Sequence, residues 1–126
     1  MTNELPVTFT FIALGVASIF ALTAWIGLRR GPLNVLRGHG GDAVLEKRIR
    51  IHGNFVENAA LVALAMLAAE LLGLTSGWLW AALISFYLGR VLHYAIYDRK
   101  SRAAPMILTQ LPALAISIWI LLRLWA

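Results

Sequence analysis

One stretch of this sequence carries charged and amide side chains directly into a long apolar segment. Arg50, Asn54, Glu57 and Asn58 are spaced at i, i+4, i+7 and i+8, so on a helix of 3.6 residues per turn they share one stripe. A carboxylate and amides at that depth are costly to keep against lipid, and such groups usually line a site or meet a partner. The guanidinium suits carboxylates or phosphates, the carboxylate suits an ammonium or an arginine, and the amides supply directional hydrogen bonds.

A second polar stripe lies further along the chain. Arg90, His93, Tyr94 and Tyr97 recur at i, i+3, i+4 and i+7, which again places them on one helical face. The first stripe begins its helix and the second ends the next helix. In an antiparallel pair, both stripes therefore reach the same depth.

The other two apolar segments each add an arginine to this layer. Arg29 follows the first segment and Arg102 precedes the fourth. Several guanidiniums and one carboxylate at one level suit an anionic, zwitterionic small molecule. We expect Arg90 to pair with Glu57 or with a carbonyl, because an unpaired charge at that depth is costly. The alternative for the whole layer is a polar network that only fixes helix packing.

The elements that must position these groups are four apolar segments. The chain has 126 residues, of which 60% are hydrophobic and 13% charged, and its mean hydropathy of +0.77 is too high for a soluble domain of this size. Each segment is near the roughly 20 residues that a helix needs to cross a bilayer. The sequence predicts an all-α membrane protein, one domain over residues 1–126, whose four transmembrane helices form a bundle at about 7–28, 44–74, 78–97 and 105–125.

Basic residues concentrate in two of the connections between these segments. Residues 29–52 contain six of the 11 Lys and Arg residues, and residues 98–104 contain three more. The positive-inside rule assigns both connections to the cytoplasm and both termini to the other side, with Arg123 as an exception. This distribution explains the net charge of +5 better than nucleic-acid binding does. We expect a multi-pass protein of a bacterial inner membrane.

Cysteine is absent and only three histidines are present. The chain therefore offers no disulfide, no thiolate nucleophile and no complete ligand set for a metal ion. Any sulfur chemistry must arrive with a ligand.

Two motifs resemble those of the MAPEG family, the membrane-associated proteins of eicosanoid and glutathione metabolism. The segment from Arg50 to Glu57 (R-I-H-G-N-F-V-E) resembles the family's R-x-H-x-N-x-x-E pattern, and that from Arg90 to Tyr97 (R-V-L-H-Y-A-I-Y) resembles R-x-x-H/Y-x-x-x-Y. The resemblance covers nearly the whole chain. It implies a homotrimer of four-helix subunits that binds glutathione between neighbouring subunits, near the cytoplasmic side.

The resemblance also implies roles for individual residues. Arg50 and Arg29 would hold glutathione carboxylates, and Glu57 would hold the amino group or an arginine partner. The remaining glutathione ligands that it implies are Asn54, Asn58, His93 and Tyr97. Arg102 would stabilise the glutathione thiolate as the catalytic residue, and Arg99 is the alternative because the segment after Tyr97 is short.

These implied roles predict a glutathione-dependent membrane enzyme, a transferase or a peroxidase, that acts on lipophilic electrophiles reaching it from the bilayer. The competing hypothesis is a non-catalytic membrane protein that binds glutathione, or that uses the polar network only for packing.

Overall fold

Four long helices make up the protein in a computed structural model that describes residues 4–126, apart from the side chain of Arg102. A short 3₁₀ turn, η1 (Lys100–Arg102), precedes the last helix. The helices are α1 (Pro6–Leu33), α2 (Ala43–Leu71), α3 (Ser76–Ala95) and α4 (Ala103–Trp125).

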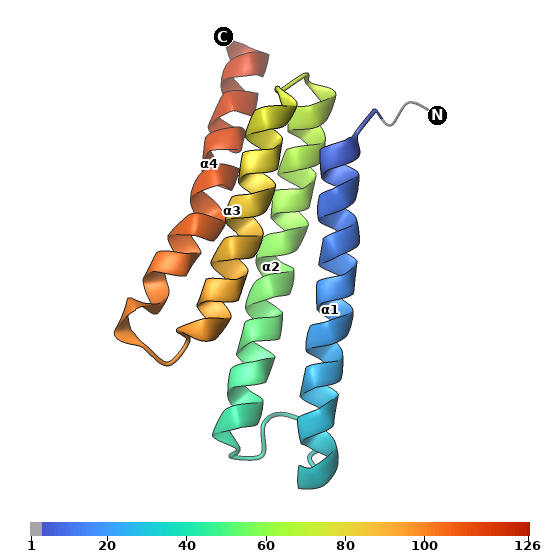
Figure 1. The fold of residues 1–126 in the computed structure, drawn as a ribbon, viewed down its shortest axis with the longest axis vertical. Helices are drawn as coiled ribbons and strands as arrows, with labels where there is room; N and C mark the ends of the chain where they lie inside the picture. Colours follow the sequence, from blue (N-terminus) through green and yellow to red (C-terminus); the bar gives the residue numbers. More distant parts are fainter. Residues whose placement is uncertain (1–3) are drawn as a thin grey trace.

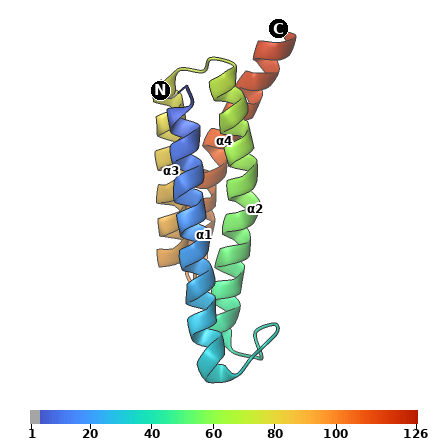
Figure 2. The ribbon, with the colours of Figure 1, turned by 90° about the vertical axis from the view of Figure 1, so that its right-hand side faces the viewer.

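The helices run alternately up and down along one long axis (Figure 1). Both termini and the α2–α3 turn lie at one end, and the α1–α2 and α3–α4 connections lie at the other. We call these the terminal end and the basic end, because most of the Lys and Arg residues lie in the connections at the second end or in the helix turns next to them. α1 packs mainly on α2, whereas α4 packs on α3 and α2, and Figure 2 shows α1 and α4 on opposite sides of the bundle.

The helix boundaries lie close to the predicted ones, with one clear difference. α1 continues past residue 28 through the Gly31–Pro32 pair and ends only at Leu33, before Asn34, which adopts a left-handed conformation with φ of 52°. A left-handed residue ends a helix because its amide hydrogen bonds back to the last carbonyls. A glycine-rich turn follows, with positive φ at Gly38, Gly40 and Gly41.

Aromatic rings from three helices form the centre of the bundle. Phe86 of α3 contacts Phe11 of α1 and Phe55 of α2, with ring centroids 4.9 and 5.9 Å apart in edge-to-face arrangements. Such geometry adds to the stability that burial of the rings already provides. Met66 and Leu79 are also fully buried and extend this core toward the terminal end.

Outside this core the helices expose large apolar side chains. Phe20, Leu28 and Leu61 are 77%, 75% and 71% exposed, and similar side chains cover much of the surface. A soluble monomer rarely exposes such extensive apolar area, whereas lipid tails solvate it. The protein is therefore a multi-pass integral membrane protein.

By length and apolar composition, three helices qualify as membrane spans: α1, α2 and α4. α3 is less apolar because Arg90, His93 and several aromatic residues interrupt it. It nevertheless joins the end of α2 to the start of α4, and these two helices run in the same direction (Figure 1). α3 must therefore return across the same thickness.

Glu70 caps the N-terminus of α1 from the neighbouring helix. Its carboxylate accepts hydrogen bonds from the backbone amides of Val7, at 3.2 Å, and Thr8, at 2.9 Å. The residue at the N-cap position of α1, Leu5, has no side chain able to do this. A carboxylate on α2 thus satisfies two amides that α1 leaves open, where the helix dipole favours negative charge.

Replacing Glu70 by alanine should lower the free energy of unfolding by about 1–3 kcal/mol, because two buried amides lose a charged acceptor. Thermal unfolding in detergent measures the loss, and hydrogen exchange should accelerate at Val7 and Thr8. Glu4→Gln is the matched control, since Glu4 is exposed at the same end. Equal stability of the two variants would show that the cap contributes nothing.

Candidate functional site

α3 and α4 approach each other closely at Gly89, near the basic end. A Cβ atom at this position would lie 2.6 Å from the Thr109 hydroxyl oxygen and 2.8 Å from the Pro105 carbonyl oxygen. Only glycine allows this approach without displacing backbone atoms. The contact brings Thr109 of α4 within reach of Arg90, the next residue of α3.

Arg90 is 8% exposed and joins three helices. Its guanidinium donates to the Thr109 hydroxyl at 3.2 and 3.0 Å, to the Met106 sulfur at 2.9 Å, and to the side-chain oxygen of Asn54. We expected an ion pair with Glu57 or a bond to a carbonyl. The structure shows a carbonyl partner, the side-chain amide oxygen of Asn54. All the acceptors that the structure describes for Arg90 are neutral groups.

A polar cavity of about 360 Å³ lies next to this network. α2 lines it with Arg50, Gly53, Asn54 and Glu57, and the end of α3 and the turn after it line it with His93 and Tyr97. The two sequence stripes thus meet at one depth, as their spacing predicted. Asn54 has committed its oxygen to Arg90, so its amide nitrogen is the group left for a ligand.

The cavity is open on one side and its charges are exposed. The Arg50 side chain is 68% exposed and makes only a 3.3 Å contact with Glu46, one turn earlier. Such an exposed i, i+4 pair is weak and is easily exchanged for a ligand. Glu57 is exposed as well, and it makes no ion pair with the side chains that the structure describes.

Tyr97 is held over the cavity by its surroundings. Its ring centroid lies 5.4 Å from that of His93 and 5.4 Å from the Lys47 ammonium. Lys47 also contacts Asp98 at 2.5 Å, which ties the turn after α3 to the start of α2. A second polar cavity, of about 380 Å³, is lined by Lys47, Asp98, Arg50 and Tyr97 among others, so it adjoins the first.

Arg29 has a different environment from the other predicted ligands. Its guanidinium contacts Asp42 at 3.2 and 2.7 Å, and Asp42 also accepts from the Leu45 amide as the N-cap of α2. The Arg29 guanidinium and the Leu45 amide hold the pKa of Asp42 below its usual value. Arg29 therefore pins the α1–α2 connection and does not line the cavity of its own chain.

Asn58 also lies outside the cavity lining. It donates to the Asn54 carbonyl at 2.7 Å and accepts from the Gln110 amide of α4 at 3.1 Å. The hydrogen bond from Gln110 links α4 to α2. Amide pairs of this kind hold helices together in lipid.

The sequence patterns did not point to Thr109, although the structure makes it the main partner of Arg90. A single threonine in an apolar helix carries little signal, because its hydroxyl commonly bonds its own backbone. Thr109 does so too, at 3.0 Å to Pro105.

The side chain of Arg102, the predicted activating arginine, lies outside the described part of the structure.

These features define a class: a multi-pass membrane protein of four antiparallel helices, with a polar cavity between α2 and α3 at its basic end. The family model for MAPEG matches residues 7–122, so the chain belongs to the MAPEG family. Comparisons with curated proteins and with solved structures gave no match. Membership places the protein in a glutathione-related family of membrane enzymes, typically transferases, peroxidases and synthases.

Proposed function

We propose that this protein is a glutathione-dependent membrane transferase that conjugates lipophilic electrophiles. The alternative within this proposal is a peroxidase that reduces such compounds with glutathione. The observation that carries the proposal is the polar cavity of about 360 Å³ at the basic end of a bundle whose surface is largely apolar. It contains a guanidinium, a carboxylate and an amide on one helix. Keeping these groups at a lipid-covered surface costs free energy, and a bound ligand that pairs with them would offset this cost.

The order of the groups suits glutathione, which carries two carboxylates, one ammonium and one thiol. Arg50 and Glu57 are seven residues apart on α2, or roughly 10 Å along the helix axis. A ligand with a carboxylate at one end and an ammonium near the other would contact both. Between them the Asn54 amide can donate to a ligand carbonyl, and His93 and Tyr97 line the facing wall.

A homotrimer would complete this site. Arg50 and Glu57 face outward from a single chain, and a neighbouring subunit would cover them and exclude lipid. Arg29 and Asn58, which contact other parts of their own chain, would be ligands only in such an assembled site. The positive-inside rule would place this layer near the cytoplasmic surface.

The proposed reaction begins with loss of the thiol proton to solvent. Arg102, or Arg99 in its place, stabilises the resulting thiolate by its fixed positive charge. The sulfur then forms a bond to an electrophilic carbon, and the leaving group departs with the electron pair of the bond that breaks. Because the electrophile approaches from the bilayer, lipophilic compounds are the substrates expected.

Binding is tested by thermal unfolding of the detergent-solubilised protein with increasing glutathione. A ligand at 100 times its dissociation constant should stabilise the protein by about 2.7 kcal/mol. Glu57→Gln should weaken binding roughly 10- to 100-fold, the value of one charge-assisted hydrogen bond, while Glu4→Gln should bind as the wild type does. Absence of stabilisation at millimolar glutathione would refute the proposal.

Turnover distinguishes the enzyme from a non-catalytic glutathione-binding protein. Conjugation of glutathione to a halonitrobenzene, followed by absorbance, should proceed faster with the wild type than in buffer. Stabilisation by glutathione without conjugate formation from any of several electrophiles would favour the non-catalytic alternative.

A further inference from the structure

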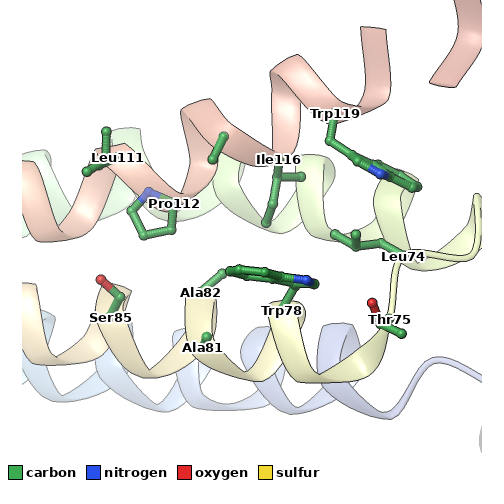
Figure 3. Close-up of a pocket in the computed structure, with 11 residues that line it drawn as sticks. Leu74, Thr75, Trp78, Ala81, Ala82, Ser85, Leu111, Pro112, Ile116 and Trp119 are labelled. Carbon is green, nitrogen blue, oxygen red and sulfur yellow. The ribbon is translucent and has the colours of Figure 1, made fainter. Parts of the chain in front are cut away.

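An apolar cavity of about 510 Å³ lies between α3 and α4 at the terminal end. Figure 3 shows the indole rings of Trp78 and Trp119 projecting into the space between the two helices, with Ile116 between them. The size is within the range of ligand sites, about 300–1,000 Å³. Trp78 is 70% exposed, so the cavity opens onto the surroundings of the helix pair.

The cavity follows from the way α3 meets α4. The two helices are in close contact at Gly89, and Pro112 lies inside α4 just beyond that contact. Proline lacks an amide hydrogen and leaves the carbonyl four residues earlier without its helical partner. Ser85 of α3 donates to that carbonyl, Leu108, at 2.6 Å. The substitute bond stabilises the interruption, and the cavity lies on its terminal side.

This cavity is separate from the polar cavity that Arg50 and Glu57 line. Trp78 and His93 are 15 residues apart on the same helix, which corresponds to roughly 20 Å at about 1.5 Å per residue. A molecule held beside Trp78 does not place its reacting atoms near His93. The apolar cavity is therefore no part of the proposed glutathione site, and the two share no lining residue.

Its lining changes from apolar to polar along its length. Ala81, Leu111 and Ala115 give the cavity an apolar wall. The Ser85 hydroxyl donates its hydrogen bond to the Leu108 carbonyl. At the terminal end stand the Thr75 hydroxyl and two indoles, groups that favour the lipid–water boundary.

Arg123 adds a charge at that boundary. It lies four residues after Trp119, so it shares the helical face that lines the cavity and sits one turn beyond it. It is exposed, and within the part of the chain that the structure describes it has no carboxylate partner. The same residue is the exception to the charge bias of the sequence.

We propose that this cavity holds one acyl chain of a phospholipid from the leaflet at the terminal end, with the phosphate of its headgroup on Arg123. The apolar cavity lies between two membrane-spanning helices, which lipid acyl chains surround. The arginine supplies the charge complementary to a phosphate. The bound lipid fills the gap that the Pro112 interruption leaves between α3 and α4.

The test uses the full chain in detergent micelles with added dioleoyl phosphatidylglycerol, and counts retained lipid by native mass spectrometry. The wild type should retain one lipid per chain. Ala115→Phe, which fills the cavity from α4, should retain at least fivefold less, whereas Ala13→Phe, at an exposed position of α1, should retain as much as the wild type.

The headgroup is tested with Arg123→Gln, a surface change that leaves the bundle core intact. It should reduce retention of phosphatidylglycerol to the level of dioleoylglycerol, which lacks the phosphate. Equal retention by Ala115→Phe and Ala13→Phe would overturn the proposal. Equal retention of the two lipids by the wild type would also overturn it. A change of oligomeric state in Ala115→Phe without loss of lipid would overturn it too, because a second copy of the chain would then be what covers the cavity.

Discussion

Gly89→Ala should lower the free energy of unfolding by about 3 kcal/mol or more, at the upper end of the usual cost of overpacking. The added Cβ would lie 2.6 Å from the Thr109 hydroxyl, 2.8 Å from the Pro105 carbonyl and 3.0 Å from the Thr109 amide nitrogen. Two of these three atoms belong to the α4 backbone, so no side-chain rotation relieves the clash. α4 must move away from α3.

That movement would also reach the polar cavity. Thr109 accepts two hydrogen bonds from Arg90, and Arg90 holds the side chain of Asn54 at the cavity wall. Separation of α3 and α4 should therefore free Asn54 and weaken glutathione binding together with stability. Thermal unfolding with and without glutathione measures both effects.

Gly77→Ala is the matched control, because Gly77 lies on the same helix and a Cβ there meets no atom within 4 Å. It should leave stability unchanged or raise it by a few tenths to about 1 kcal/mol, as alanine favours helix over glycine. If Gly89→Ala were as stable as Gly77→Ala, the close contact between α3 and α4 would not exist as described.

Arg102→Gln should remove most of the bound thiolate while glutathione still binds. A thiol with its ordinary pKa of about 8.5 is only about 3% ionised at pH 7. If the arginine lowers that pKa by about two units, within the range expected beside an opposite charge, its loss should reduce the thiolate fraction more than tenfold. Conjugation should fall less steeply, because a less acidic thiol gives a more nucleophilic thiolate.

The direct measurement is thiolate absorbance as a function of pH. In the wild type the signal should appear well below pH 8.5, and in Arg102→Gln it should shift upward toward that value. Arg99→Gln is the comparison that assigns the role: only one of the two variants should shift the titration. An unshifted titration in both would exclude an arginine at this turn as the activating group.

The polar cavity could be predicted from the sequence because helical spacing is regular. Arg50, Asn54 and Glu57 fall on one stripe of α2, His93 and Tyr97 on one stripe of α3, and the antiparallel turn between these helices brings the stripes to one level. Periodicity does not say which neighbour each side chain meets. Asn58 belongs to the same stripe by spacing, yet its place beside α4 directs it to Gln110.

Arg90 shows the same limit more strongly. Its depth in an apolar helix required a partner, either Glu57 or a carbonyl, and Asn54 supplies the carbonyl. Thr109 and Met106 were not expected, and they reach Arg90 because Gly89 lets α4 approach. The identity of those partners depends on the distance between two helices. No local pattern in either helix encodes that distance.

The amino-acid sequence by itself determined the membrane class, the four helices, the end of the bundle that is basic, and the family motifs of the cavity, because composition and helical period act locally. Only the tertiary structure decided that Glu70 caps α1, that Arg29 is bound by Asp42, and that Pro112 and Gly89 leave an apolar cavity beside Trp78. Each of these features joins parts of the chain that are not neighbours in the sequence. They arise from packing, which depends on the shapes of both surfaces at once.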